Sequence, residues 1–146
     1  MPQVSKWLLV TFIVFSFLGF LDATFLTIQH YQQGIAPCYV FTGCDEVLYS
    51  EYSTIIGVPV ALLGAIYYLF ILITSIFYFD TGRSFALKIM AYVPILGFLA
   101  SLGFVYLQLF VIQAICFYCM LSATLSTLLF ILGILFMLKL KRVEAD

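Results

Sequence analysis

Four cysteines in two pairs are the residues of this chain most able to do chemistry. Cys38 and Cys44 are separated by five residues, and Cys116 and Cys119 by two. Residues three apart on a helix share a face, and their Cα separation suits a disulfide. Two such pairs can exchange disulfides by attack of a thiolate on a disulfide sulfur. The cysteines therefore indicate thiol–disulfide redox chemistry.

The composition places these cysteines in a membrane protein. Hydrophobic residues make up 65% and charged residues 9% of the 146 residues, whereas soluble domains have about 45–50% and about 25%. About 20 apolar residues in a helix cross the hydrocarbon core. Four stretches of the chain are long enough, and we expect them to lie in a single domain, 1–146. These spans are placed at residues 7–28, 59–79, 87–112 and 116–138.

The connection over residues 29–58 is expected to cap the bundle on the membrane surface. Asp45 can serve as the N-cap of a short helix that runs to about Tyr52, and Pro59 suits the first turn of the second span. Short connections between the later spans favour an antiparallel packing. The expected fold class is an all-α integral membrane protein, a four-transmembrane-helix bundle with an extracytoplasmic loop and short-helix cap.

The basic residues predict which way the bundle faces. Lys6 precedes the first span, Arg83 and Lys88 lie at the second connection, and three more follow the fourth span. Lysine and arginine favour the cytoplasmic side, so both termini are expected there and all four cysteines are expected outside. A loop pair can then meet soluble thiols, while a pair at the bilayer edge can meet a lipid-soluble oxidant.

Other uses of the cysteines stay open at this point. The pair Cys38 and Cys44 could form a permanent disulfide of an extracytoplasmic loop. Cysteine can also serve as a small apolar residue of a membrane helix. Zinc sites usually pair two short Cys-x2–4-Cys knuckles, which the spacing of Cys38 and Cys44 fits poorly, so no metal ligand is assigned. Nucleic acid is not an expected partner, because the six basic residues are scattered.

Longer motifs resemble the vitamin K epoxide reductase homologues, in particular their prokaryotic members. The order and spacing of both cysteine pairs agree with that family, and the resemblance covers nearly the whole chain. The matching pieces are residues 21–27 (LDATFLT) with His30-Tyr31, Cys38-x5-Cys44-Asp45-x-Val47-Leu48-x-Ser50, Ser53-x3-Gly57-Val58-Pro59 with Gly64 and Tyr67, and Cys116-x2-Cys119.

This resemblance implies a helix bundle around a quinone of the menaquinone, ubiquinone or vitamin K type. Cys38 would accept electrons from a thioredoxin-like or DsbA-like protein outside the cytoplasm, and Cys44 would exchange with Cys116. Cys119 would lie beside the quinone and pass electrons to it, and Ser50 is the implied quinone-binding residue. The implied enzyme is a membrane quinone reductase of a prokaryotic cytoplasmic membrane that supports disulfide bond formation. Because no fused thioredoxin-like domain follows the fourth span, its partner is expected to be a separate protein.

Several alternatives bear on this resemblance. Vertebrate members have a tyrosine where this chain has Ala123, which favours a respiratory quinone over vitamin K epoxide. The disulfide bond formation protein B family has its C-x-x-C in the first outer loop, so the order of motifs argues against it. A structural or metal-binding membrane protein with static disulfides is the alternative from another class.

The sequence does not assign a single role to the ionisable residues Asp22 and His30. An ionisable residue inside a span is a candidate functional residue, but Asp22 lies only about two turns from the outer end of its span. A wet interfacial position, a structural hydrogen bond and a proton-handling role all suit Asp22 at that depth. His30 is expected at the membrane interface rather than as a base.

Overall fold

Four long helices make up most of this computed structural model, which describes residues 5–32, 54–55, 58–112 and 117–145. Each helix is long and apolar enough to cross a membrane. The prediction of an all-α membrane bundle with four spanning helices is thereby confirmed. The helices are α1 (Lys6–Gln32), α3 (Val60–Thr81), α4 (Ser84–Tyr106) and α5 (Phe117–Ala145).

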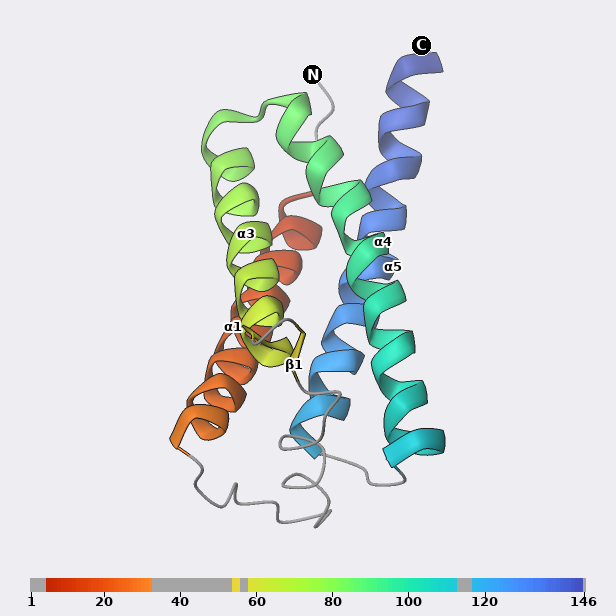
Figure 1. Cartoon of the computed structure of the whole chain (residues 1–146). Helices are drawn as coiled ribbons and strands as arrows, with labels where there is room; N and C mark the ends of the chain where they lie inside the picture. Colours follow the sequence, from red (N-terminus) through yellow and green to blue (C-terminus); the bar gives the residue numbers. More distant parts are fainter. Residues whose placement is uncertain (1–4, 33–53, 56–57, 113–116, 146) are drawn as a thin grey trace.

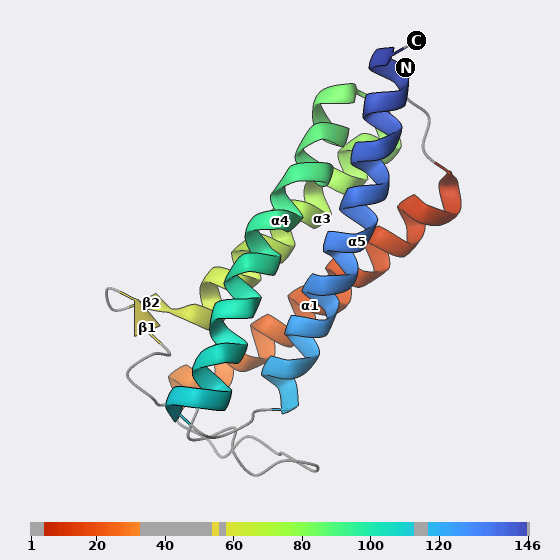
Figure 2. The same cartoon turned by 90° about the vertical axis from the view of Figure 1, so that its right-hand side faces the viewer.

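The four helices pack as a ring of neighbours. α1 packs against α3 and α5, and α4 packs against the same two helices. The start of α1, the turn between α3 and α4, and the end of α5 lie at one end of the bundle (Figure 1). Seen from the side, α1 crosses the bundle at a visible tilt (Figure 2). The start of α5, which carries Cys119, is therefore at the end opposite to the basic residues.

The turn between α3 and α4 is held by a glycine. Gly82 has a φ of 69°, a left-handed conformation that glycine adopts without steric cost. Its N–H donates to the Tyr78 carbonyl at 2.8 Å, which satisfies one of the free carbonyls at the helix end. Arg83 then provides the extended residue before α4. This tight connection makes α3 and α4 antiparallel neighbours.

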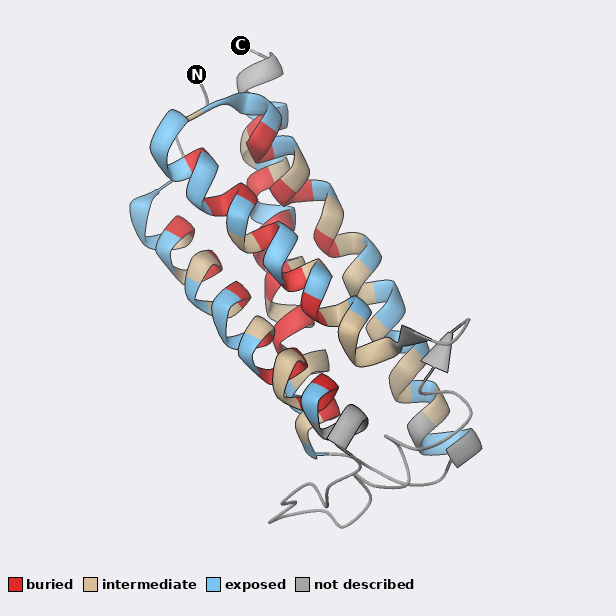
Figure 3. Cartoon of the chain, turned by 60° about the vertical axis from the view of Figure 1, so that its left-hand side comes forward, coloured by how far each residue is buried: buried red, intermediate tan, exposed pale blue. Residues whose placement is uncertain are grey.

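The core runs along the inside of the ring, and the outer faces are apolar as well. Phe12 and Phe136 are fully buried, with ring centroids 5.2 Å apart. Buried positions lie where the helices face one another, and exposed positions lie outside (Figure 3). Because many exposed residues are large and hydrophobic, the outer surface suits contact with lipid tails.

Most buried hydroxyls are satisfied by their own helices. Ser16 donates to the Phe12 carbonyl at 2.8 Å, and Ser75 donates to the Ile71 carbonyl at 2.7 Å. Thr27 on α1 makes the same kind of bond one turn back. Such bonds let a hydroxyl lie inside a bilayer without a partner on another helix.

The helix ends differ from the sequence prediction. Pro59 pairs in a two-stranded antiparallel ribbon of β1 (Thr54–Ile55) and β2 (Val58–Pro59), and α3 begins at Val60. The end of the third span is a π-helix, Leu107–Ile112. The helix of the fourth span, α5, continues to Ala145, and its candidate membrane span ends at Arg142 rather than at the predicted Leu138. The predicted short cap helix lies outside the described residues.

Glycines allow the helices to approach closely at two tyrosines. A Cβ at Gly19 would overlap the ring of Tyr68, and a Cβ at Gly97 would overlap the hydroxyl of Tyr67. Small residues at such crossings let the backbones of membrane helices come together. Gly19 on α1 and Gly97 on α4 therefore fix where the two tyrosines of α3 can lie.

We predict that Gly19→Ala destabilises the bundle. The added methyl group must displace the buried Tyr68 ring, and overpacking of this kind costs about 1–3 kcal/mol. The measurement is the free energy of unfolding in detergent micelles. Gly103→Ala is the matched control, because a Cβ there meets nothing within 4 Å and alanine favours the helix by about 1 kcal/mol. Equal effects of the two substitutions would contradict the packing described for Gly19.

Candidate functional site

Cys119 is the candidate redox residue that the structure describes. It lies in the first turn of α5 and is buried, with 8% of its surface exposed. Cys38, Cys44, Cys116 and Ser50 lie outside the described residues, so their positions and pairing remain predictions. The side chain of His30 lies outside the described part of the chain as well.

A tyrosine from α3 fixes α5 about one turn from Cys119. The Tyr68 hydroxyl donates to the Ser122 carbonyl at 2.8 Å and lies 3.1 Å from Ser122 Oγ. Residues three apart share a helix face, so Ser122 lies on the same side of α5 as Cys119. Tyr68 is 2% exposed and rests against Gly19 of α1. This contact joins three helices at the end of the bundle that carries the cysteine.

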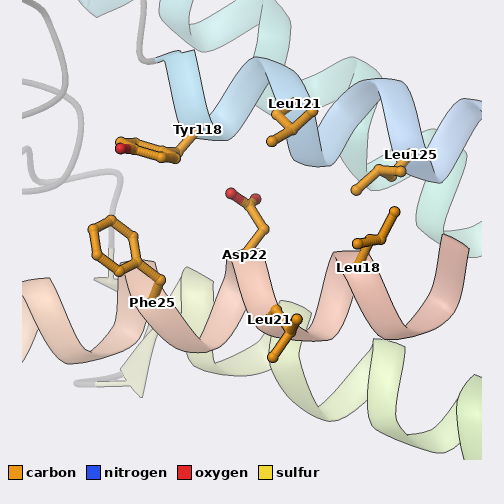
Figure 4. A pocket seen from close by; sticks show the side chains of 7 residues that line it. All are labelled: Leu18, Leu21, Asp22, Phe25, Tyr118, Leu121 and Leu125. Atoms are coloured by element: carbon orange, nitrogen blue, oxygen red, sulfur yellow. The ribbon is translucent and has the colours of Figure 1, made fainter. Parts of the chain in front are cut away.

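An apolar crevice lies between α1 and α5 at the same end. Its volume is about 330 Å³. Phe25 and Tyr118 form one wall, with ring centroids 5.0 Å apart. Tyr118 adjoins Cys119 in the sequence, but Cys119 is not among the lining residues, because successive residues of a helix point to different faces. The lining residues, drawn in Figure 4, are Leu18, Leu21, Asp22, Phe25, Tyr118, Leu121 and Leu125.

Asp22 is the one ionisable carboxyl in that lining. Its side chain extends from α1 across the crevice toward α5 (Figure 4). The residue is 8% exposed, and its Oδ2 atom is buried without a hydrogen-bond partner. An unpaired ionised carboxylate inside a membrane is costly. The position therefore calls for a partner or a role, and the structural hydrogen bond considered from the sequence does not form at Oδ2.

The sequence profile described as the vitamin K epoxide reductase family matches residues 10–134. This segment contains both cysteine pairs, Asp22, Tyr68 and most of the four helices. The chain belongs to the vitamin K epoxide reductase family. No curated protein matches the chain with significant similarity.

Membership of the vitamin K epoxide reductase family and the four spanning helices agree with each other. Together they make the chain a multi-pass integral membrane protein and indicate an oxidoreductase. The predicted family and fold class are thus both confirmed. Members of this family are generally linked to quinones.

Sequence reasoning missed part of the polar cluster that Tyr67, Tyr68, Ser122 and Ser126 form near Cys119. Tyr67 belonged to the matching motif, but Tyr68, Ser122 and Ser126 were not singled out. The hydroxyls of Tyr67 and Ser126 are buried and interact electrostatically. The two groups do not meet the geometric criteria of a hydrogen bond. A usable signal was present, because Ser122 and Ser126 lie three and seven residues after Cys119, on one helix face.

We predict that Tyr68→Phe weakens the junction of α3 and α5. The substitution keeps the ring but removes the hydroxyl that bonds Ser122, which costs about 1 kcal/mol. The free energy of unfolding in micelles measures this loss. Tyr92→Phe is the matched control, because Tyr92 is 52% exposed on the outer face of α4. A loss no larger than that of the control would contradict the role assigned to the Tyr68 hydroxyl.

Proposed function

We propose that the chain is a quinone-dependent thiol–disulfide oxidoreductase that supports disulfide bond formation outside the cytoplasm. The observation that carries this proposal is the position of Cys119, which is buried at the start of a spanning helix and next to a residue that lines an apolar crevice. Family membership supports redox chemistry in the membrane. A buried cysteine at the bilayer edge suits electron transfer to a lipid-soluble acceptor.

Electrons enter at the loop pair in this proposal. A thiolate of a reduced thioredoxin-like protein attacks Cys38 of the Cys38–Cys44 disulfide, and Cys44 leaves as a thiolate. The partner's second thiol then closes the partner's own disulfide and frees Cys38. The partner has lost two electrons at this stage, and Cys38 and Cys44 hold them as thiols.

The second exchange moves these electrons to the helix pair. Cys44 attacks Cys116 of the Cys116–Cys119 disulfide, and Cys119 leaves as a thiolate. Cys38 then displaces Cys116, which restores the loop disulfide and leaves the helix pair reduced. The start of a helix favours the thiolate form of a cysteine through its dipole.

The crevice between α1 and α5 fits a quinone. Its walls are apolar and aromatic, with Phe25, Tyr118 and Leu121 able to hold the ring. A bound quinone supplies an acceptor for two electrons and two protons. Ser50 is proposed as a further quinone-binding residue on the resemblance alone.

The orientation proposed from the sequence agrees with this chemistry. All six lysines and arginines lie toward the end of the bundle away from Cys119, and basic residues favour the cytoplasm. We place both termini in the cytoplasm of a prokaryotic cell and the cysteines outside, with the chain as one domain. Reduced thioredoxin-like proteins of the oxidising compartment can then reach Cys38.

We predict that the purified protein reduces a quinone when a reduced thioredoxin-like protein is supplied. Cys119→Ser removes the thiol that is proposed to reduce the quinone, so the rate of quinone reduction should fall to that of the uncatalysed reaction. Quinol formation is followed by its absorbance. Thr124→Val is the matched control, because Thr124 is exposed on the same helix and bonds its own backbone. A Cys119→Ser variant with the control's rate would contradict the proposal.

We also predict a trapped complex at the loop pair. A thioredoxin-like protein without its second cysteine cannot complete the exchange and should remain joined to Cys38 through a disulfide. A non-reducing gel reports this adduct. Cys38→Ser should abolish the adduct, whereas Cys119→Ser should retain it because the loop disulfide is intact. Inert bridges that give no adduct would instead support a structural protein with static disulfides.

A further inference from the structure

Asp22 is a buried carboxyl that the exchange of thiols does not use. Only 8% of the surface of Asp22 is exposed, and its Oδ2 atom has no hydrogen-bond partner. Its side chain points into the crevice between Tyr118 and Leu121 of α5 (Figure 4). A buried polar atom that is aimed into a cavity without a partner indicates a ligand that supplies the partner.

The mouth of this crevice faces the bilayer. Leu18 and Leu21 of α1 are 44% and 49% exposed, and Leu121 of α5 is 41% exposed. These side chains lie within membrane-spanning stretches, so the occupant that can reach Asp22 is soluble in lipid. A polar group on an otherwise apolar molecule is the chemistry that such a site accepts.

The neighbouring hydroxyl cannot replace Asp22 as a donor. Tyr68 lies within electrostatic reach of Asp22, but its single proton is engaged with the Ser122 carbonyl. Thr27, five residues after Asp22 on α1, gives its proton to the Ala23 carbonyl. Tyr118 also lines the crevice, but its hydroxyl lies at the end of the ring away from Asp22 (Figure 4). Asp22 in its neutral form therefore presents a proton between Tyr118 and Leu121, and the neutral acid avoids a buried, unpaired charge.

We propose that Asp22 is a catalytic residue that donates a hydrogen bond, and then its proton, to a carbonyl oxygen of a quinone bound between α1 and α5. The inference rests on the proposed function, since that function supplies the electrons. The inference adds a role for the Asp22 carboxyl. It also adds a route by which the quinone enters from the bilayer, through the mouth of the crevice at Leu18 and Leu21.

The protons and electrons balance. Oxidation of the thiols of Cys116 and Cys119 to a disulfide releases two electrons and two protons. Asp22 gives its proton to one ligand oxygen as the electrons arrive, and it regains a proton from those that the thiols release. The second oxygen takes the other thiol proton. Asp22 ends each cycle as it began, and the quinol carries away both electrons and both protons.

Infrared difference spectroscopy tests the contact directly. Purified protein in micelles is mixed with decylubiquinone or menadione while the cysteines are oxidised, so that no turnover occurs. The C=O stretch of a protonated carboxylic acid should shift on binding and should respond to D2O. Asp22→Asn lacks this band, so its difference spectrum should contain no such change.

The Asp22→Asn variant also separates binding from proton transfer. Asparagine keeps the shape and a hydrogen-bond donor, so the affinity for the quinone, measured by titration calorimetry, should change little. The rate of quinone reduction should fall by about 10²-fold or more, because asparagine cannot give up a proton. Thr27→Val is the matched control, since Thr27 is equally buried on α1, and it should keep the rate.

The outcomes distinguish this inference from the proposed function. A wild-type protein without a carboxylic-acid change on binding, or an Asp22→Asn variant with the wild-type rate, would overturn the inference while thiol-driven reduction stands. If the protein shows the infrared change but does not reduce quinone with thiols, the contact between Asp22 and the quinone stands. That result would contradict only the proposed thiol path. Because the infrared measurement uses the unaltered chain, it stays informative even when the variant does not fold.

Discussion

The absence of water inside a bilayer is the constraint on which this structure depends. Every polar group in a spanning segment must find its partner within the protein. Ser16, Thr27 and Ser75 meet this requirement through their own helices, and Tyr68 meets it across the bundle at Ser122. Asp22 does not meet it at Oδ2, and the buried hydroxyls of Thr24, Tyr67 and Ser126 have no hydrogen-bond partner either. Among these four groups, the Asp22 carboxyl is the one that lines the crevice, where a ligand can provide the missing partner.

The same constraint separates the two halves of the proposed reaction. Exchange with a soluble partner requires cysteines that water can reach, whereas reduction of a quinone requires a cysteine at the edge of the hydrocarbon. The start of α5 is such an edge, with Cys119 buried and Tyr118 lining the crevice. Tyr68 and Gly19 hold this turn of α5 against α3 and α1. The bundle therefore positions the end of the proposed path, while the loop supplies its beginning.

The sequence predicted the helices well and their faces poorly. Length and hydropathy located four spans, because a bilayer sets the length of each segment. The strand at Pro59 was missed because it depends on pairing with Thr54. The π-helix at Leu107–Ile112 was missed because its wider hydrogen-bond spacing leaves no mark on the hydropathy of the segment. The helices are apolar on all sides, so no stripe reveals which face packs inward. Residue type singled out Asp22, but its direction toward α5 and the bond from Tyr68 to Ser122 required the structure.

The most direct test of the proposed function is a single turnover without oxygen. The protein is first reduced at all four cysteines and freed of reductant, and one equivalent of quinone is then added. We predict that one quinol forms for each pair of thiols lost. Mass spectrometry should find Cys38 joined to Cys44, because the reduced loop pair passes its electrons to the Cys116–Cys119 disulfide that forms first. A quinone that stays oxidised while the thiols persist would contradict the proposed function.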